Sequence, residues 1–172
     1  MTLEEALRGK EIPDEIKEEL SIISVPHISF DGNKHEGQLI VHKDVAREMR
    51  EIFEELFKRR FPIHQIIPIT HYNWDDDASM AANNTSAFSY RVIYGETKRL
   101  SNHSYGRAID LNPLLNPYIG IDGAVAPSGA VYDISVPGTI TEDIAAIFKS
   151  CGWKWGGDWN PKDWQHFEKT PD

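Results

Sequence analysis

The sequence contains a single cysteine, Cys151, and this scarcity excludes several classes of protein. One thiol cannot build a disulfide framework within the chain or the multi-thiolate site of a zinc finger. Any metal must therefore be held by histidine, aspartate or glutamate, a ligand set that suits zinc. Cys151 itself lies between the end of a predicted helix and Gly152, and we expect it to be a small buried side chain.

Basic residues and long apolar runs are also scarce. The chain has 18 Lys and Arg against 27 Asp and Glu, which gives a formal net charge of -9. Without a stripe of Lys and Arg, it is a poor candidate for nucleic-acid binding. Met1 is followed by acidic residues, and no secretory signal or membrane span is visible. Three situations stay open: a signal that has been removed, residence in the cytosol, or release by a route that needs no signal.

The remaining composition is that of a globular domain. With 172 residues, of which 40% are hydrophobic and 26% charged, the chain is long enough to bury one core. We expect a single domain over residues 1–172, with residues 1–20 as a helical arm at its periphery, and a monomer. The order of elements predicts an α+β fold with a mostly antiparallel sheet and flanking helices.

Periodicity and turn residues give the expected elements. Residues 45–60 have apolar positions at helical spacing, with Asp44 as the expected N-cap. A second helix is expected to begin at a cap on Thr139 or Thr141 and to reach Phe148. Expected strands cover residues 22–30, 38–41, 61–69, 88–94, 106–111, 153–155 and 165–168. Short helices or turns are expected before residue 20 and over 75–84, and a long loop, of a kind that is often functional, over 113–138.

Two short segments together contain the ligands of a catalytic zinc site. The stretch from Ser101 to Asp110 provides His103 and Asp110, and Asp163-Trp-Gln-His166 provides a second imidazole. Three protein ligands and an open fourth position are typical of catalytic zinc. The additional carboxylate of Asp163 is the proton carrier that a zinc hydrolase needs.

The spacing within each segment predicts its shape. His103 and Asp110 are seven residues apart, so a continuous strand would place them on opposite faces. We therefore expect a loop that carries His103, a turn at Gly106 and a strand that delivers Asp110. Asp163 and His166 are three apart, which also does not suit a straight strand, and Pro161 allows a tight turn before a strand that starts near His166.

Each residue also has an ordinary explanation when taken alone. A single histidine near a strand is more often exposed or hydrogen-bonded than a ligand. Asp110 lies in the apolar context Ala-Ile-Asp-Leu, where an unpaired carboxylate is costly, but a salt bridge to an arginine would remove that cost as well as a metal would. The other five histidines lack ligand-like spacing, and we take them as structural or exposed: His27, His35, His42, His64 and His71.

The joint pattern resembles a known family. Ser-x-His-x-x-Gly-x-Ala-x-Asp, from Ser101 to Asp110, is similar to the signature of VanY-type D-alanyl-D-alanine carboxypeptidases and of L-alanyl-D-glutamate endolysin peptidases. Asp163 and His166 match the second half of that signature. The flanking residues 153–159 and 166–168 also resemble the family, and the likeness covers roughly residues 88–168. It implies the hedgehog/DD-peptidase type of fold.

The resemblance implies a zinc peptidase with His103, Asp110 and His166 as ligands. Asp163 would act as general base and then as general acid. Carboxypeptidases and dipeptidases of the family commonly have Glu at that position and endolysin-type members have Asp, which favours the endolysin branch. Glu168 is the rival base, and its alternative role is to orient a ligand imidazole.

Further site residues follow from the resemblance and from position. The family has an arginine near Arg91 that contacts the developing oxyanion or a substrate carbonyl. The alternative for Arg91 is a surface position or a salt bridge to one of the acidic residues 75–77. Ser101 could bind substrate or cap the loop, and Tyr105 and Trp164 are further substrate-binding candidates. Four tryptophans are expected to form a core wall beside the site, or else a carbohydrate platform: Trp153, Trp155, Trp159 and Trp164.

Three functions remain in competition. The first is a zinc peptidase that cuts peptidoglycan stem peptides, with specificity in the loop 113–138 and in the segment before Arg91. The second is a non-catalytic binding module held together by zinc, as in the hedgehog signalling domain, although the presence of Asp163 argues against it. The third is a zinc amidase that cuts the junction between sugar and peptide.

Overall fold

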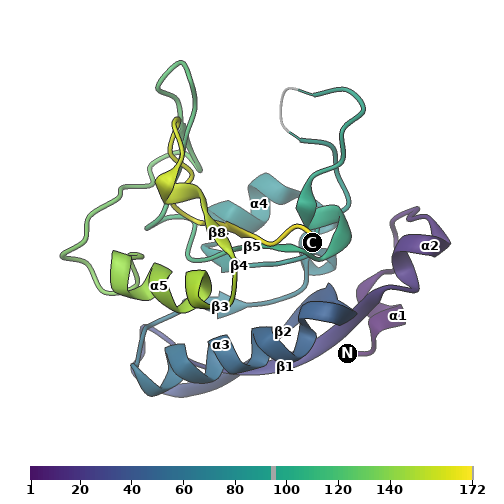
Figure 1. The fold of residues 1–172 in the computed structure, drawn as a ribbon, viewed down its shortest axis with the longest axis horizontal. Coiled ribbons are helices and arrows are strands. Elements are labelled where there is room, and N and C mark those ends of the chain that lie inside the picture. The colour runs from purple at the N-terminus through teal and green to yellow at the C-terminus, as the bar shows by residue number, and fades with distance from the viewer. Residues whose placement is uncertain (94–95, 172) are drawn as a thin grey trace.

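The computed structural model describes residues 1–93 and 96–171, which form an α+β fold (Figure 1). The helices are α1 (Leu3–Ala6), α2 (Asp14–Lys17), α3 (Ala46–Lys58), α4 (Asp76–Ala81) and α5 (Glu142–Ser150), with 3-10 helices η1 (Lys43–Val45), η2 (Ile69–Tyr72), η3 (Asn102–Tyr105) and η4 (Gly156–Asp158). The strands are β1 (Leu20–Ile28), β2 (Lys34–His42), β3 (Gln65–Ile66), β4 (Asn84–Thr85), β5 (Ala108–Asp110), β6 (Tyr118–Ile119), β7 (Val125–Ala126), β8 (Lys154–Trp155) and β9 (His166–Glu168). No helix among these residues is both long and apolar enough to cross a membrane.

A long hairpin and one amphipathic helix form the base of the molecule. Strands β1 and β2 pair antiparallel from Leu20 opposite His42 to Ile28 opposite Lys34, and α3 lies along them (Figure 1). The apolar face of α3 is buried in the main core, as its periodicity predicts. Its start differs from the prediction, because η1 precedes it and Val45, not Asp44, is the N-cap. The Asp44 carboxylate instead forms an ion pair with Arg107.

The site is built on a second, three-stranded sheet with the order β5-β9-β8, in which all neighbours are antiparallel. The short parallel pair β3-β4 adjoins it through a bridge between Ser86 and Asp110. Helix α5, whose N-cap is Thr141, joins α3 in the same core. Each strand of the three-stranded sheet has a fully buried residue there: Ile109, Trp155 and Phe167. The sheet is thus mostly antiparallel, as expected.

Two expected strands do not form over their predicted lengths. Over 61–69 only β3 is a strand, and Pro62 and Pro68, which have no N–H to donate to a ladder, flank it. Over 88–93 only Val92 makes a bridge, to Leu100, and Tyr94 lies outside the described residues. The partner segment is irregular here: the N–H of Ser101 donates to the carbonyl of Arg91 at 3.0 Å, but the N–H of Arg91 donates to the Ser104 hydroxyl at 2.9 Å and not to a backbone group.

The expected loop over 113–138 contains only the small hairpin β6-β7, and buried asparagines hold its ends. Asn116 is fully buried; its amide donates to the carbonyl of Gly138 at 3.1 Å and accepts from the N–H of Ile140 at 2.7 Å. Asn112, also fully buried, donates to the carbonyl of the same Gly138 at 3.0 Å. These hydrogen bonds provide partners for polar backbone groups at the end of the loop that do not pair with a strand.

The N-terminal helices and the tryptophans complete the packing. Ala6 of α1 and Ile12 are buried in a second, smaller apolar cluster with Leu20, Ile40 and Phe88. Trp153 and Trp155 lie in the main core, and Trp164 packs against it, which agrees with a core wall. Cys151 is half-buried at the edge of the same core, so it is less enclosed than expected.

Candidate active site

The first half of the site is a bent unit of loop, turn and strand. Ser101 begins η3, and its hydroxyl accepts from the N–H of His103 at 3.3 Å. Gly106 ends η3 with φ of 63°, and a β-carbon there would lie 2.5 Å from the backbone nitrogen of His42. Only glycine fits this left-handed turn against β2. After the turn, β5 brings Asp110 toward His103, so the shape predicted from the spacing is confirmed.

The second half is a turn followed by β9. The N–H of His166 donates to the carbonyl of Asp163 at 3.3 Å, which closes a tight turn before the strand begins. In the antiparallel ladder, His166 on β9 is the direct partner of Asp110 on β5. Side chains of direct partners project from the same face of a sheet. Pairing of the strands therefore brings together two residues that are 56 positions apart.

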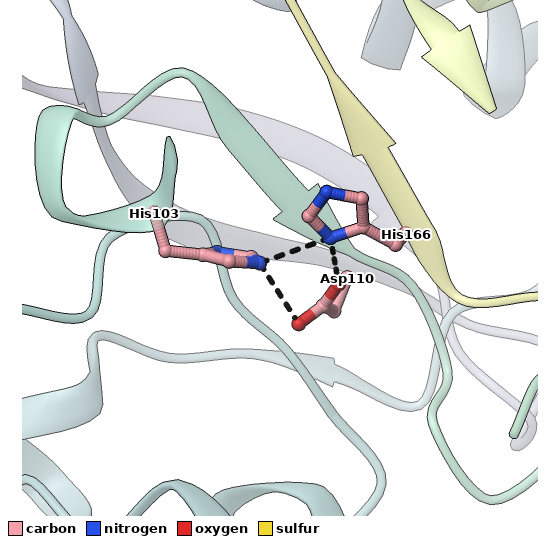
Figure 2. Close-up of side chains that lie close together, drawn as sticks. All are labelled: His103, Asp110 and His166. Carbon is pink, nitrogen blue, oxygen red and sulfur yellow. Dashed lines mark hydrogen bonds and ion pairs between the residues drawn. The ribbon is translucent and has the colours of Figure 1, made fainter. Parts of the chain in front are cut away.

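Three ligand atoms converge between η3, β5 and β9 (Figure 2). His103 Nε2 lies 3.2 Å from Asp110 Oδ2, and His166 Nδ1 lies 3.0 Å from Asp110 Oδ1. The two ring nitrogens are 3.2 Å apart. Bonds of about 2.0 Å in a tetrahedral zinc site imply ligand–ligand distances of about 3.3 Å. This group of His103, Asp110 and His166 could hold a metal ion.

Each ligand ring has an inner nitrogen that faces Asp110 and an outer nitrogen that faces away from it. The hydrogen bonds of the outer nitrogens determine which ring nitrogens carry hydrogens. His103 Nδ1 lies 2.6 Å from the carbonyl oxygen of Ala87, and His166 Nε2 lies 3.2 Å from Glu168 Oε2. Both partners can only accept, so these two nitrogens carry the hydrogens. When both rings are neutral, His103 Nε2 and His166 Nδ1 then direct lone pairs at each other and at the Asp110 carboxylate. Lone pairs and a carboxylate that face one another repel unless a cation lies between them. A metal ion at the centre would supply that positive charge.

The charges of the site agree with this view. Burial lowers the pKa of His166, but its hydrogen bonds to Asp110 and Glu168 outweigh burial and raise the pKa to about 10. Burial raises the pKa of the Asp110 carboxyl, and His103 and His166 more than offset this, so its pKa lies well below its usual range. The pocket between these groups therefore favours positive charge.

Asp163 lies beside the ligand group with a free oxygen. Burial, opposed by the charge of His166, raises the pKa of Asp163 to about 6. Its Oδ1 is buried and has no hydrogen-bond partner among the described residues. A carboxyl with a pKa close to neutrality and an unused oxygen is suited to accept and release a proton. Glu168, the rival base, differs: its hydrogen bond from His166 lowers its pKa, and Asn102 donates to it at 2.7 Å.

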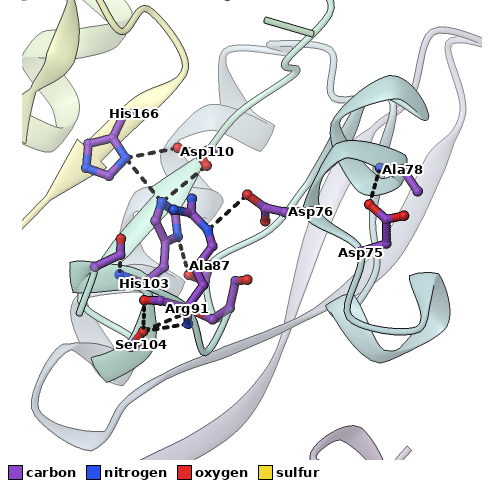
Figure 3. Close-up of polar contacts among 11 residues, drawn as sticks. Asp75, Asp76, Ala78, Ala87, Arg91, His103, Ser104, Asp110 and His166 are labelled. Atoms are coloured by element: carbon purple, nitrogen blue, oxygen red, sulfur yellow. Dashed lines mark hydrogen bonds and ion pairs between the residues drawn. The ribbon is translucent and has the colours of Figure 1, made fainter. Parts of the chain in front are cut away.

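Arg91 forms an ion pair with an acidic residue and lies near Asp163. Its Nε lies 2.9 Å from Asp76 Oδ2 in the first turn of α4, which is the salt bridge considered from the sequence (Figure 3). Its charge also lowers the pKa of Asp163, which places the guanidinium within electrostatic reach of the site. The closest approach in this ion pair is through Nε, not through either terminal nitrogen of Arg91.

The remaining candidates have varied surroundings. Ser101 caps η3, the second of its two expected roles. Tyr105 is exposed on η3. Trp164 stacks on Tyr132, with ring centroids 3.8 Å apart, and Trp159 lies 5.3 Å from the ring of His166. Two groups were missed from the sequence: the Ala87 carbonyl, which no sequence signal reveals, and Asn102, whose place beside His103 was the available signal.

Comparison with known proteins agrees with this site. The family model described as D-alanyl-D-alanine carboxypeptidase matches residues 95–169. That segment contains the three ligand residues, Asp163 and Glu168, whereas Arg91 lies before it. No curated protein and no solved structure matches the chain. Over residues 95–169 the chain is therefore similar to the D-alanyl-D-alanine carboxypeptidases, a family of peptidases, and this supports the resemblance to the VanY-type family.

Proposed function

We propose that the protein is a zinc-dependent peptidase that cleaves the stem peptides of peptidoglycan. The observation that carries this proposal is the meeting of three ligand atoms, one from each residue and all within 4.8 Å of one another, beside a carboxyl group with an unpartnered oxygen. Two histidines and one carboxylate form a three-ligand set of the kind that catalytic zinc takes. A structural zinc site would need no extra carboxyl, so Asp163 favours an enzyme over a binding module.

The chain's own residues divide the work of peptide hydrolysis. Zinc held by His103, Asp110 and His166 would supply an electrophile for the scissile carbonyl and would make water more acidic. Asp163 takes the proton of the attacking water on its free carboxylate oxygen and later passes it to the leaving amine. Burial raises the pKa of Asp163 to about 6, close to the pH at which one group can both accept and release a proton.

Arg91 and Glu168 have supporting roles in this proposal. Negative charge develops on the carbonyl oxygen during attack, and the terminal nitrogens of Arg91, held in direction by Asp76, offer fixed positive charge to it. Glu168 already accepts hydrogen bonds from His166 and Asn102, so we assign it to orientation of the ligand and not to proton transfer. Tyr105 and Trp164 remain candidates for substrate contact.

The test combines metal analysis with digestion of muropeptides. We expect one zinc per chain, and chelator-sensitive cleavage whose new termini mass spectrometry identifies. Release of single D-alanine would indicate a carboxypeptidase, larger fragments an L-alanyl-D-glutamate type of endopeptidase. Release of whole stem peptides from the glycan would instead indicate an amidase and would refute the proposed peptide cleavage.

One variant separates catalysis from metal binding. Asp163→Asn should retain the fold and the zinc but lose turnover, because the amide cannot accept the proton. The matched control is Asp158→Asn, which removes an exposed carboxylate at the end of η4 that pairs with Lys149. Full activity of Asp163→Asn would remove the mechanism, and a wild-type protein that binds zinc without cutting any wall peptide would favour the binding module.

A further inference from the structure

We infer that Asn102 is a positioning residue that couples the two halves of the metal site through Glu168. The inference deepens the proposed function and rests on its metal site. Asn102 precedes His103 on η3, whereas Glu168 follows His166 by two residues on β9. The link between them therefore joins the segment of one ligand histidine to the segment of the other.

The geometry is a chain of two hydrogen bonds that meet at one oxygen. Asn102 Nδ2 donates to Glu168 Oε2 at 2.7 Å, and His166 Nε2 donates to the same oxygen at 3.2 Å. Glu168 is half-buried, with a side-chain exposure of 20%. An ionised carboxylate at this place gains from both donors, since a carboxylate oxygen accepts more than one hydrogen bond.

The two ligand rings differ in how they are held. The outer nitrogen of His103 donates to the backbone carbonyl of Ala87 at 2.6 Å, and a backbone group is fixed by the fold itself. The outer nitrogen of His166 relies on Glu168, a flexible side chain with rotatable bonds. Without a second contact, that carboxylate could turn toward solvent and leave the imidazole free to rotate. Asn102 supplies the second contact, so it fixes Glu168 and thereby the direction of His166 Nδ1.

The matching variants are Asn102→Ala and Asn102→Asp. The first removes the donor; the second keeps the size but places an acceptor against the Glu168 carboxylate. The readout is the zinc dissociation constant of the purified full chain, measured by competition with a chromophoric chelator. Loss of a hydrogen bond behind a ligand typically weakens metal affinity by about 10-fold to 100-fold. We expect a loss of about 10-fold for Asn102→Ala and a greater one for Asn102→Asp.

A double-mutant cycle distinguishes positioning through Glu168 from a general loss of stability. Glu168→Ala should weaken zinc binding, and Asn102→Ala should add little in that background, because the carboxylate through which it acts is gone. The control is Gln38→Ala, which removes an amide that bonds to Met1, far from the ligands in sequence and on a different sheet. It should leave zinc affinity unchanged.

Each outcome bears on one proposal or the other. If Asn102→Ala binds zinc as tightly as the wild type, or weakens binding equally with and without Glu168, the coupling is refuted while the peptidase proposal stands. If the wild type binds no zinc, the proposed function fails and the inference fails with it. Absence of peptidase activity alone does not affect the inference, since substrate takes no part in the measurement.

Discussion

Gly156 makes room for Asp163. A β-carbon on Gly156 would lie 2.3 Å from the carbonyl oxygen of Asp163 and 2.8 Å from its β-carbon, closer than atoms can pack. The N–H of Asp163 donates to the carbonyl of Gly156 at 3.0 Å, and on the other side Tyr118 of β6 forms a bridge with Asp163. The proposed base is thus held by backbone contacts between η4 and β6, and its position depends on the missing side chain of Gly156.

Gly156→Ala should therefore impair catalysis without removing the metal. The added methyl group must push the Asp163 backbone away, and a displacement of about 1 Å at a catalytic group can reduce the rate about 100-fold. We expect a fall of about that size in kcat/KM, with zinc content and the far-ultraviolet circular dichroism spectrum unchanged.

The control for this variant is Gly32→Ala. Gly32 lies in the turn between β1 and β2, where a β-carbon would meet no atom within 4 Å, although its φ of 78° makes alanine somewhat strained. It should lose some stability and keep its activity. Wild-type kcat/KM in Gly156→Ala would show that the position of Asp163 does not depend on this contact.

Arg91 should act on the transition state and not on the metal. Removal of a group that stabilises an oxyanion typically reduces kcat about 100-fold to 1000-fold. We expect Arg91→Ala to lower kcat by at least about 100-fold, with KM and zinc affinity little changed. Steady-state kinetics on a purified muropeptide will measure kcat and KM of the variant and of the wild type.

Asp76→Asn and Arg47→Ala complete this experiment. Asp76→Asn weakens the ion pair that directs Arg91, so it should reduce kcat less than loss of the arginine does. Arg47→Ala removes an arginine whose side chain is 91% exposed and pairs with Glu51, and it should have no effect. An equal, small loss in all three variants would assign Arg91 to structure alone.

The bend between His103 and Asp110 could be predicted because its cause is local. An odd separation is incompatible with one face of a strand, and Gly106 lies between the two residues with a φ of 63°. The pairing of His166 with Asp110 is not local, and only the family signature connected them in the sequence. The ladder of β5 and β9 supplies the physical reason for that signature.

Other features could not be predicted because tertiary contacts outweigh local preference. The alternating pattern over 88–93 indicates a strand, yet the N–H of Arg91 donates to the Ser104 hydroxyl and not to the backbone of the neighbouring segment. Glu168 has the spacing of a base on the ligand strand, and only its contacts with His166 and Asn102 distinguish orientation from proton transfer. Neither the Ser104 contact nor the Asn102 contact leaves a periodic signal in the sequence.

Removal of the metal should lower thermal stability. A ligand that binds only the folded state at 1000 times its dissociation constant contributes about 4 kcal/mol. For a chain of this length, 1 kcal/mol corresponds to about 2–4 °C. We therefore expect a chelator to lower Tm by about 10 °C, as measured by differential scanning calorimetry. His166→Ala should show no such shift, and a chelator effect that persists in this variant would contradict the assigned site.

His27 should make stability depend on pH independently of the site. Its side chain is 4% exposed on β1, its Nδ1 has no partner among the described residues, and burial, assisted by the charge of His35, lowers its pKa to about 4. The unfolded chain binds this proton at a pKa of about 6.5. Above about pH 6.5 His27 is neutral in both the folded and the unfolded chain, so its titration does not reduce the free energy of unfolding.

As pH falls from about 6.5 to about 4, only the unfolded state gains the proton, so stability decreases by up to about 1.4 kcal/mol per pH unit, or about 3 kcal/mol in all. Urea unfolding at pH 7 and pH 5, with a chelator present throughout, will measure the loss. His27→Gln should lose less between these two values than the wild type, because glutamine does not titrate. His71→Gln, at an exposed position on η2, should retain the wild-type dependence. An unchanged slope in His27→Gln would mean that the buried imidazole takes up its proton without opposing folding.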